Sequence, residues 1–226
     1  MKFDNLDIRR KKTLSEIAYD YIKNMIIAGV LKGGDILTEK SIGEELNMSR
    51  TPVKRAFTRL EQERYVRSID GIGTIVENLS LKDLADIYEV RIELEKIAIR
   101  SSIKNIRISE LNSFEEEFNF ILSEIHNDRK PDDNYLSKID EKFHMFILKN
   151  STNSYIKDIY KNIKSQIIRY KREAYVLTDT SEQSTIYHLK IIEFLKMRDL
   201  KGSLNMMEEH LRWSYDTLVE ELTKLN

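Results

Sequence analysis

Three helical patterns and a hairpin signal follow one another in the first third of the chain, and this order constrains the fold more than any other feature. Apolar residues recur every three or four positions in segments 15–28, 38–46 and 49–64, which is the pattern of amphipathic helices. Two short stretches, 65–69 and 74–77, then flank a turn with two glycines, which is typical of a β-hairpin. The order predicts a winged helix-turn-helix domain with a two-stranded wing.

The second and third helices both begin at residues that suit a helix start. Thr38 is a plausible N-cap, and the Ser49 hydroxyl can cap the next helix. Pro52 falls in the first turn, where its missing N–H costs little. The apolar residues of the third helix form one face: Val53, Ala56, Phe57 and Leu60. The opposite face is basic, because segment 50–60 contains no acidic residue and four cations, Arg50, Lys54, Arg55 and Arg59.

The charge of the chain is divided unevenly. The formal net charge is -1, but residues 1–76 hold 14 Lys and Arg against 11 Asp and Glu, and the remaining 150 residues hold 23 against 27. A basic first segment with a cation-rich helix can neutralise phosphates. A helix can also carry a basic face for solubility alone, so the charge pattern by itself leaves both interpretations open.

From residue 80 onward every apolar pattern is helical. The pattern predicts six segments, at 80–103, 108–127, 132–149, 153–177, 181–198 and 201–225. Short polar connections separate them, for example 150–152 and 178–180. Long helices with short connections predict an antiparallel six-helix bundle. We therefore expect a mainly α chain of two domains, 8–78 and 80–225.

Several classes of protein are excluded by what the sequence lacks. The chain has no cysteine, so disulfides and thiolate metal sites are excluded. No apolar run approaches the roughly 18–20 residues that span a bilayer. The first residues lack the apolar stretch of a signal peptide, so we expect a cytoplasmic protein that does not contact membranes.

Three of the four histidines, together with one aspartate, occupy positions from which they can converge. Asp140 and His144 are four residues apart, so they lie on the same face of one helix. His188 and His210 lie at similar distances on either side of the connection between the last two helices. His126 lies beside a break and is expected to be solvated. On the residues alone, histidines with local hydrogen bonds and a pairing of Asp140 with a lysine remain the alternative to a metal site.

The chain resembles the GntR family of bacterial regulators, in its FadR-like branch with a C-terminal all-helical FCD domain. The N-terminal resemblance is carried by segments 29–39, 49–56, 60–61 and 71–76. The C-terminal resemblance is carried by segments 89–95, 140–144 and 210–211 and by His188. A bundle of six helices is more similar to the VanR-type subdivision than to the seven-helix FadR type.

The resemblance implies that the first domain binds double-stranded operator DNA. The N-terminus of the third helix would enter the major groove, where the Arg50 guanidinium can make a bidentate contact to guanine. The resemblance also places Lys40 and Lys54 at DNA-facing positions. Further expected contacts are made by Ser49, Thr51, Arg55 and Arg59, with Gly71 and Gly73 letting the wing backbone approach DNA. The alternative for Arg55 and Arg59 is a purely solvated role.

The resemblance further implies a divalent metal site in the bundle. Its expected ligands are Asp140, His144, His188 and His210. We expect zinc, with nickel, manganese and iron as alternatives. Arg91 matches an arginine that lines the effector cavity of the family, and Arg169 is a second expected cation for a small carboxylate metabolite. The alternative for Arg91 is a surface ion pair with Glu95.

Together these features predict a homodimeric repressor, not an enzyme, that a small organic acid releases from a palindromic operator. A homodimer is expected because one winged helix supplies few contacts to a two-fold operator. Two other functions compete with this prediction. A metal-dependent hydrolase would need a general base beside the metal, and the sequence offers no obvious one. A helical protein-interaction module would leave the basic helix without a role.

Overall fold

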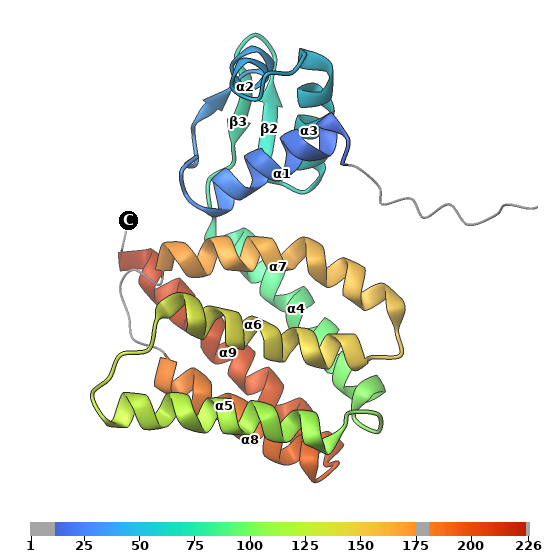
Figure 1. Cartoon of the computed structure of the whole chain (residues 1–226), viewed down its shortest axis with the longest axis vertical. Helices are drawn as coiled ribbons and strands as arrows, with labels where there is room; N and C mark the ends of the chain where they lie inside the picture. Colours follow the sequence, from blue (N-terminus) through green and yellow to red (C-terminus); the bar gives the residue numbers. More distant parts are fainter. Residues whose placement is uncertain (1–11, 175–180, 225–226) are drawn as a thin grey trace, which may run out of the picture. The chain divides into compact units, whose positions relative to one another are not determined.

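The computed structural model describes residues 12–174 and 181–224, and the chain divides into two compact units, Met1–Leu79 and Ser80–Asn226 (Figure 1). Four parts of the predictions lie outside the described residues: the domain ends at 8 and 225, the helix end at 177 and the break at 178–180. The two units are described separately.

The first unit contains three helices among its described residues, as predicted. These are α1 (Leu14–Ile27), α2 (Glu39–Glu45) and α3 (Arg50–Gln62). Thr38 caps α2, and its side chain accepts a hydrogen bond from the Ser41 N–H, which confirms the predicted cap. Ser49 also lies at an N-cap position, but its hydroxyl makes no capping hydrogen bond within the described part of the chain. The predicted Ser49 cap is therefore wrong. Its side chain is exposed, where water can satisfy the hydroxyl and the helix N–H groups instead.

The strands of this unit form a three-stranded antiparallel sheet in the order β1-β3-β2. The predicted wing consists of β2 (Val66–Ile69) and β3 (Gly73–Val76), with Ile69 opposite Gly73. The third strand, β1 (Ile36–Leu37), pairs with the other edge of β3 and was not predicted. Two residues are too few to show the alternation that marks a strand.

The apolar face of α3 packs on α1, as the sequence predicts. Val53, Ala56, Phe57 and Leu60 are all buried. They share one core cluster with residues of α1, which are Ala18, Tyr19, Ile22 and Ile26. Fully burying an aliphatic or aromatic side chain contributes about 1.5–3 kcal/mol, so this core holds α3 firmly with its basic face outward.

The second unit consists of six helices within the described residues, as predicted. They are α4 (Leu81–Ser102), α5 (Ile108–His126), α6 (Asp133–Asn150), α7 (Ser154–Ala174), α8 (Ser181–Lys196) and α9 (Leu200–Lys224). Ser80 and Asp132, the predicted first residues of two helices, are the N-caps of α4 and α6. None of the described helices combines the length and the apolar character needed to cross a membrane.

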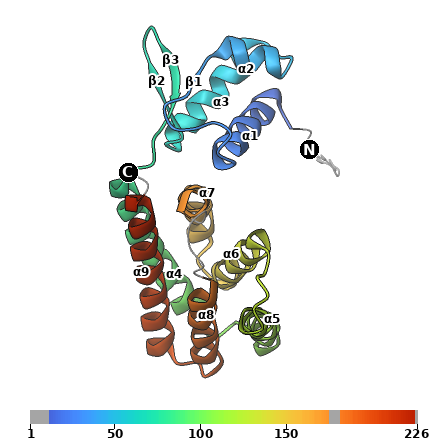
Figure 2. The same cartoon turned by 90° about the vertical axis from the view of Figure 1, so that its left-hand side faces the viewer.

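Helix α4 lies against α9, α6 and α7, while α8 packs on α9 and α5 packs on α8 (Figures 1 and 2). The interior between these helices is largely aliphatic and aromatic. Several polar side chains are nevertheless buried there, among them Arg91, Glu95, His144, His188 and His210. Buried charges are costly unless they are paired, so this group of side chains marks the place where a function is expected.

Candidate functional site

The exposed face of α3 presents the cations expected to contact DNA. Arg50, Thr51, Lys54 and Arg55 are all exposed. Within the described residues, the three cations Arg50, Lys54 and Arg55 make no ion pair. Arg50 and Lys54 are four residues apart and so lie one above the other on the same face. These side chains are thus available to an external anion.

Arg59, the fourth cation of this helix, is placed differently. Its guanidinium carbon lies 3.7 Å from the centroid of the Tyr19 ring, and its Nε is 3.3 Å from Glu63 Oε1. Glu63 also accepts hydrogen bonds from the Tyr19 hydroxyl at 2.6 Å and from Lys23 Nζ at 2.7 Å. Arg59 therefore joins a network that ties α3 to α1.

Lys40 and the wing glycines occupy other parts of the first unit. Lys40 is exposed on α2, with its Nζ 4.0 Å from Glu44 Oε1. Gly71 is exposed at the tip of the wing and has a φ of 75°. Gly73 has a φ of 133°, and a Cβ there would lie 3.0 Å from the carbonyl oxygen of Leu37. The close approach that requires glycine at position 73 is thus to β1, inside the domain.

In the second unit, four predicted ligand residues converge from three helices. Asp140 and His144 come from α6, His188 comes from α8 and His210 comes from α9. One potential ligand atom from each residue lies within 4.8 Å of all the others. His144 Nε2 is 3.3 Å from the Nε2 atoms of both His188 and His210. Asp140 Oδ1 is 3.6 Å from His188 Nε2 and 3.8 Å from His144 Nε2.

The protonation of these rings fits a metal ion. Burial lowers the pKa of His188 to about 3. Burial and the neighbouring imidazoles also lower the pKa of His210 well below its ordinary value. Both rings are neutral at physiological pH, which is the form that binds metals.

The spacing of the nitrogens fits a metal ion as well. His144 Nε2 faces two imidazole nitrogens, although its single lone pair can accept only one good hydrogen bond. In a tetrahedral site with bonds of about 2.0–2.1 Å, ligand atoms lie about 3.3–3.4 Å apart. The donor set is thus of the right type and spacing to hold a divalent ion.

A second layer of charged residues surrounds the four converging side chains. His144 Nδ1 is 2.5 Å from Glu95 Oε2, and Arg91 Nε donates to Glu95 Oε1 at 2.8 Å. Burial alone would raise the pKa of Glu95, but the neighbouring His144 and Arg91 outweigh it and hold the pKa at about 2. The ion pair of Arg91 with Glu95 therefore exists, but it is buried, in contrast to the surface pair considered from the sequence.

Asp140 has a second partner besides the histidines. Its Oδ2 accepts a hydrogen bond from Lys171 Nζ at 2.7 Å. Burial would raise the pKa of Asp140, but Lys171 and then His144 and His188 lower it well below the ordinary value. The pairing of Asp140 with a lysine, considered from the sequence as an alternative to a metal site, occurs together with the histidine cluster. One carboxylate oxygen faces the lysine and the other faces the imidazoles.

Two tyrosines complete the surroundings of Arg91. Arg91 Nη1 lies 3.4 Å from the Tyr88 hydroxyl, which in turn is 2.9 Å from Ser214 Oγ. Tyr160 is buried, and burial raises the pKa of its hydroxyl so that it stays protonated.

Arg169, the second expected cation, is buried on α7. His126 is exposed at the end of α5, 2.9 Å from Glu182, and has no part in the cluster, as expected.

The sequence did not point to four residues of this site: Tyr88, Glu95, Tyr160 and Lys171. From the sequence, Glu95 was expected only as a surface partner of Arg91. Its position on the buried face of an amphipathic helix is a signal that could have revealed it. Lys171 gave no signal, because it lies 31 residues from Asp140 on another helix.

Both units of the chain match models of known protein families. Residues 14–76 match the model of bacterial regulatory proteins of the gntR family, and residues 86–212 match the FCD domain. The second match alone covers more than half of the chain. The chain is a GntR-family transcriptional regulator with an FCD domain. This confirms the resemblance, and both families consist of DNA-binding regulators and not of enzymes.

Relatives of this GntR regulator include named repressors. It is 25% identical to the gluconate operon transcriptional repressor of Bacillus subtilis (strain 168), over 96% of this chain and 88% of the relative. It is 23% identical to the HTH-type transcriptional repressor RspR of Escherichia coli (strain K12), over 86% of this chain and 84% of the relative. The solved structure of E. coli McbR/YncC superposes on this chain with a TM-score of 0.72 at 19% sequence identity. The superposition covers 94% of this chain and 100% of the other, so the two proteins share a fold.

Proposed function

We propose that this GntR regulator is a metal- and metabolite-responsive repressor that leaves its operator when a small organic acid binds. Residues 8–78 read DNA, and residues 80–225 bind the effector and dimerise. The observation that carries the proposal is the convergence of Asp140, His144, His188 and His210 inside the FCD domain. The repressor names of two relatives support the sign of the response.

DNA is read by the exposed cations of α3. Arg50 lies at the helix start, where a guanidinium reaches base edges, and one bidentate contact to guanine is worth about 1–3 kcal/mol of discrimination. Lys54, Arg55 and Lys40 contact phosphates, and the wing tip at Gly71 approaches the adjacent groove. Ser49 and Thr51 also lie at the end of α3 that enters the groove. Arg59 contributes mainly by fixing α3 against α1, because the Tyr19 ring and Glu63 already hold its guanidinium.

The metal would be held by Asp140 and the three histidines. A bound zinc ion, or nickel, manganese or iron in its place, would supply an electron-pair acceptor for a carboxylate of the effector. Glu95 accepts a hydrogen bond from the Nδ1–H of His144, which leaves the lone pair of Nε2 directed at the other ligands. Lys171 holds the second oxygen of Asp140 and so orients the first.

The charge balance of the site favours an anionic effector. Two ion pairs are each compensated internally: Arg91 with Glu95, which is buried, and Lys171 with Asp140, which is partly buried. A divalent ion among neutral imidazoles adds positive charge that these pairs do not offset. A small carboxylate offsets it and can also accept hydrogen bonds from Arg91 and Arg169.

The release from DNA that we propose requires two DNA-reading domains, one from each chain of a dimer. A single winged helix makes few base contacts, so selective binding at cellular salt needs a dimer on a two-fold operator. An effector that favours one arrangement of the two readers by a few kcal/mol changes operator affinity by orders of magnitude. This mechanism moves the two DNA-reading domains relative to each other and requires no conformational change inside either of them.

The DNA-reading assignment is tested by selecting operator sequences from a random DNA pool. Arg50→Ala should lose selectivity against competitor DNA in gel-shift assays while keeping its circular dichroism spectrum. Lys32→Ala is a matched control, because this exposed lysine lies outside α2, α3 and the wing. Undiminished selectivity of Arg50→Ala would refute the assignment.

The metal assignment is tested with the only tryptophan of the chain, Trp213, whose ring centroid is 6.2 Å from that of His210. Titrating chelator-treated protein with Zn²⁺ should change its fluorescence and saturate at one ion per chain. The double variant His188→Ala/His210→Ala should give no saturable change, and His126→Ala should behave as the wild type. An unchanged titration in the double variant would remove the site.

A further inference from the structure

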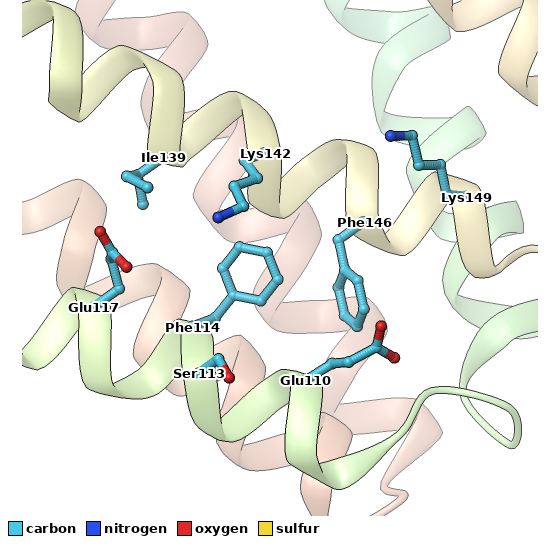
Figure 3. Close-up of a pocket in the computed structure, with 8 residues that line it drawn as sticks. All are labelled: Glu110, Ser113, Phe114, Glu117, Ile139, Lys142, Phe146 and Lys149. Carbon is cyan, nitrogen blue, oxygen red and sulfur yellow. The ribbon is translucent and has the colours of Figure 1, made fainter.

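A pocket of about 330 Å³ lies between α5 and α6, apart from the four converging ligand residues (Figure 3). Its apolar lining consists of Phe114, Ile139 and Phe146. Pockets that bind small molecules measure about 300–1,000 Å³, so this one has room for a small ligand.

The aromatic lining is fixed by ring contacts. The ring centroids of Phe114 and Phe146 are 5.1 Å apart, with the rings tilted by 47°. Phe114 also contacts the buried Phe143, with ring centroids 5.4 Å apart and an edge-on arrangement. Aromatic pairs at such separations and tilts are favourable, so the two pocket rings are held in place before any ligand arrives.

The charged residues that line the pocket are Glu110, Glu117, Lys142 and Lys149. Glu110 accepts two hydrogen bonds from Arg107, and Glu117 accepts one from the Tyr135 hydroxyl. Lys142 Nζ lies 5.8 Å from the centroid of the Phe114 ring, and its side chain is directed into the pocket (Figure 3). Within the residues that the structure describes, neither Lys142 nor Lys149 forms an ion pair with a carboxylate. These two lysines outnumber Glu117, the one pocket carboxylate that is not paired with a cation. The pocket thus combines a rigid aromatic surface with an available ammonium group.

We propose that this pocket binds a small aromatic monocarboxylate. The carboxylate pairs with Lys142 Nζ, and the aromatic ring of the ligand packs against Phe114 and Phe146. A cationic ligand is disfavoured, because Arg107 neutralises Glu110 and the two lysines outnumber the remaining carboxylate, Glu117. The site is separate from the metal centre and does not depend on the proposed function.

The two sites are nevertheless close enough that an experiment must tell them apart. Phe143 contacts both Phe114 and His188, with ring centroids 5.4 Å and 5.1 Å apart. Phe118 stacks on His188 at 4.8 Å. One layer of aromatic rings therefore separates the pocket from the histidines.

The test is a calorimetric titration of the full-length, chelator-treated protein with phenylacetate. A ligand of this size should bind with a Kd of about 1 mM. Lys142→Met should weaken binding about fivefold, since the exposed ammonium is partly screened by solvent. Lys138→Met is the matched control, because it is an exposed lysine of the same helix that does not line the pocket. Phenylethylamine, which replaces the carboxylate with an ammonium, should bind less tightly than phenylacetate.

Three results would overturn the proposal. The first is the absence of saturable phenylacetate binding up to about 10 mM. The second is equal affinity of Lys142→Met and Lys138→Met. The third is binding that survives Lys142→Met but is lost in His188→Ala/His210→Ala, since the ligand would then occupy the metal centre. Because Lys142 is exposed, its variant should keep the wild-type melting temperature, and that measurement confirms that the fold is intact.

Discussion

Replacing Glu95 with glutamine isolates the role of the buried carboxylate beside the metal centre. Glutamine has the same shape but no charge. Its amide can still accept a hydrogen bond from Arg91, but an amide NH₂ facing His144 Nδ1 meets a second donor. The imidazole can then restore the contact only by moving its proton to Nε2. That proton would occupy the lone pair directed at His188 and His210.

Two magnitudes follow from this geometry. The side chain of Arg91 is 2% exposed and that of Glu95 is 0% exposed, so removing one charge leaves the other buried and unpaired. Breaking a buried pair in this way costs about 3–5 kcal/mol of folding free energy, and the amide that remains favours the lower end. Losing an outer-shell carboxylate lowers metal affinity about 10- to 100-fold.

A second substitution separates these two effects. In Arg91→Met/Glu95→Gln no buried charge of this pair is left, so the loss of stability should be smaller than the sum of the two single losses. Metal affinity should stay low, because the carboxylate is still missing.

Both quantities can be read from Trp213, which lies on α9 and so reports on the bundle alone. Urea unfolding gives stability, and Zn²⁺ titration against a competing chelator gives affinity. Glu93→Gln is the matched control, because this exposed glutamate of the same helix loses the same charge. If Glu95→Gln binds Zn²⁺ as tightly as Glu93→Gln does, the reasoning about His144 is wrong.

Three further predictions concern other parts of the molecule. Gly73→Ala should destabilise the first unit by about 1–3 kcal/mol, because φ is 133° and the new Cβ would lie 3.0 Å from the Leu37 carbonyl oxygen; faster hydrogen exchange in β1 and β3 checks this, and unchanged exchange contradicts it. Burial raises the pKa of Glu63, but hydrogen bonds from Lys23 and Tyr19 outweigh it and hold the pKa below its ordinary value of 4.5. The ionised Glu63 carboxylate should therefore stabilise the first unit fully above about pH 4.5, and this stabilisation should be lost as the pH falls through the pKa of the folded protein. Hydrogen exchange of residues 50–62 measures this pH dependence, and Glu63→Gln should reduce it. Lys171→Met should leave the partly buried Asp140 without its cation, raise the pKa of Asp140 and weaken Zn²⁺ binding at pH 6 more than at pH 8; equal weakening at both values would argue against this role.

Features that depend on neighbours in sequence could be predicted from the sequence. Thr38 caps α2 because its partner is only three residues away. The inner face of α3 follows from helical spacing, and the pairing of Asp140 with His144 on one face follows from their separation of four residues. The approach of His188 to His210 required one further assumption, that α8 and α9 are antiparallel with a short connection.

Features that depend on contacts between distant segments could not be predicted. The packing of Arg59 on Tyr19 is set by the position of α1 relative to α3, which no spacing in the sequence reveals. The same holds for Lys171, which reaches Asp140 from another helix, and for Glu95, which binds a histidine 49 residues away. The contact of Gly73 with the Leu37 carbonyl oxygen could not be predicted either, because the sequence gave no sign of β1 beside it; the expected approach of this glycine to DNA stays a prediction.

The central claim is that the FCD domain of this regulator holds one divalent ion through Asp140, His144, His188 and His210. Native mass spectrometry of the full chain with added Zn²⁺ tests it most directly. We predict a dimer that carries one ion per chain, and loss of that ion in His188→Ala/His210→Ala but not in His126→Ala. Equal metal content in the wild type and the double variant would contradict the account.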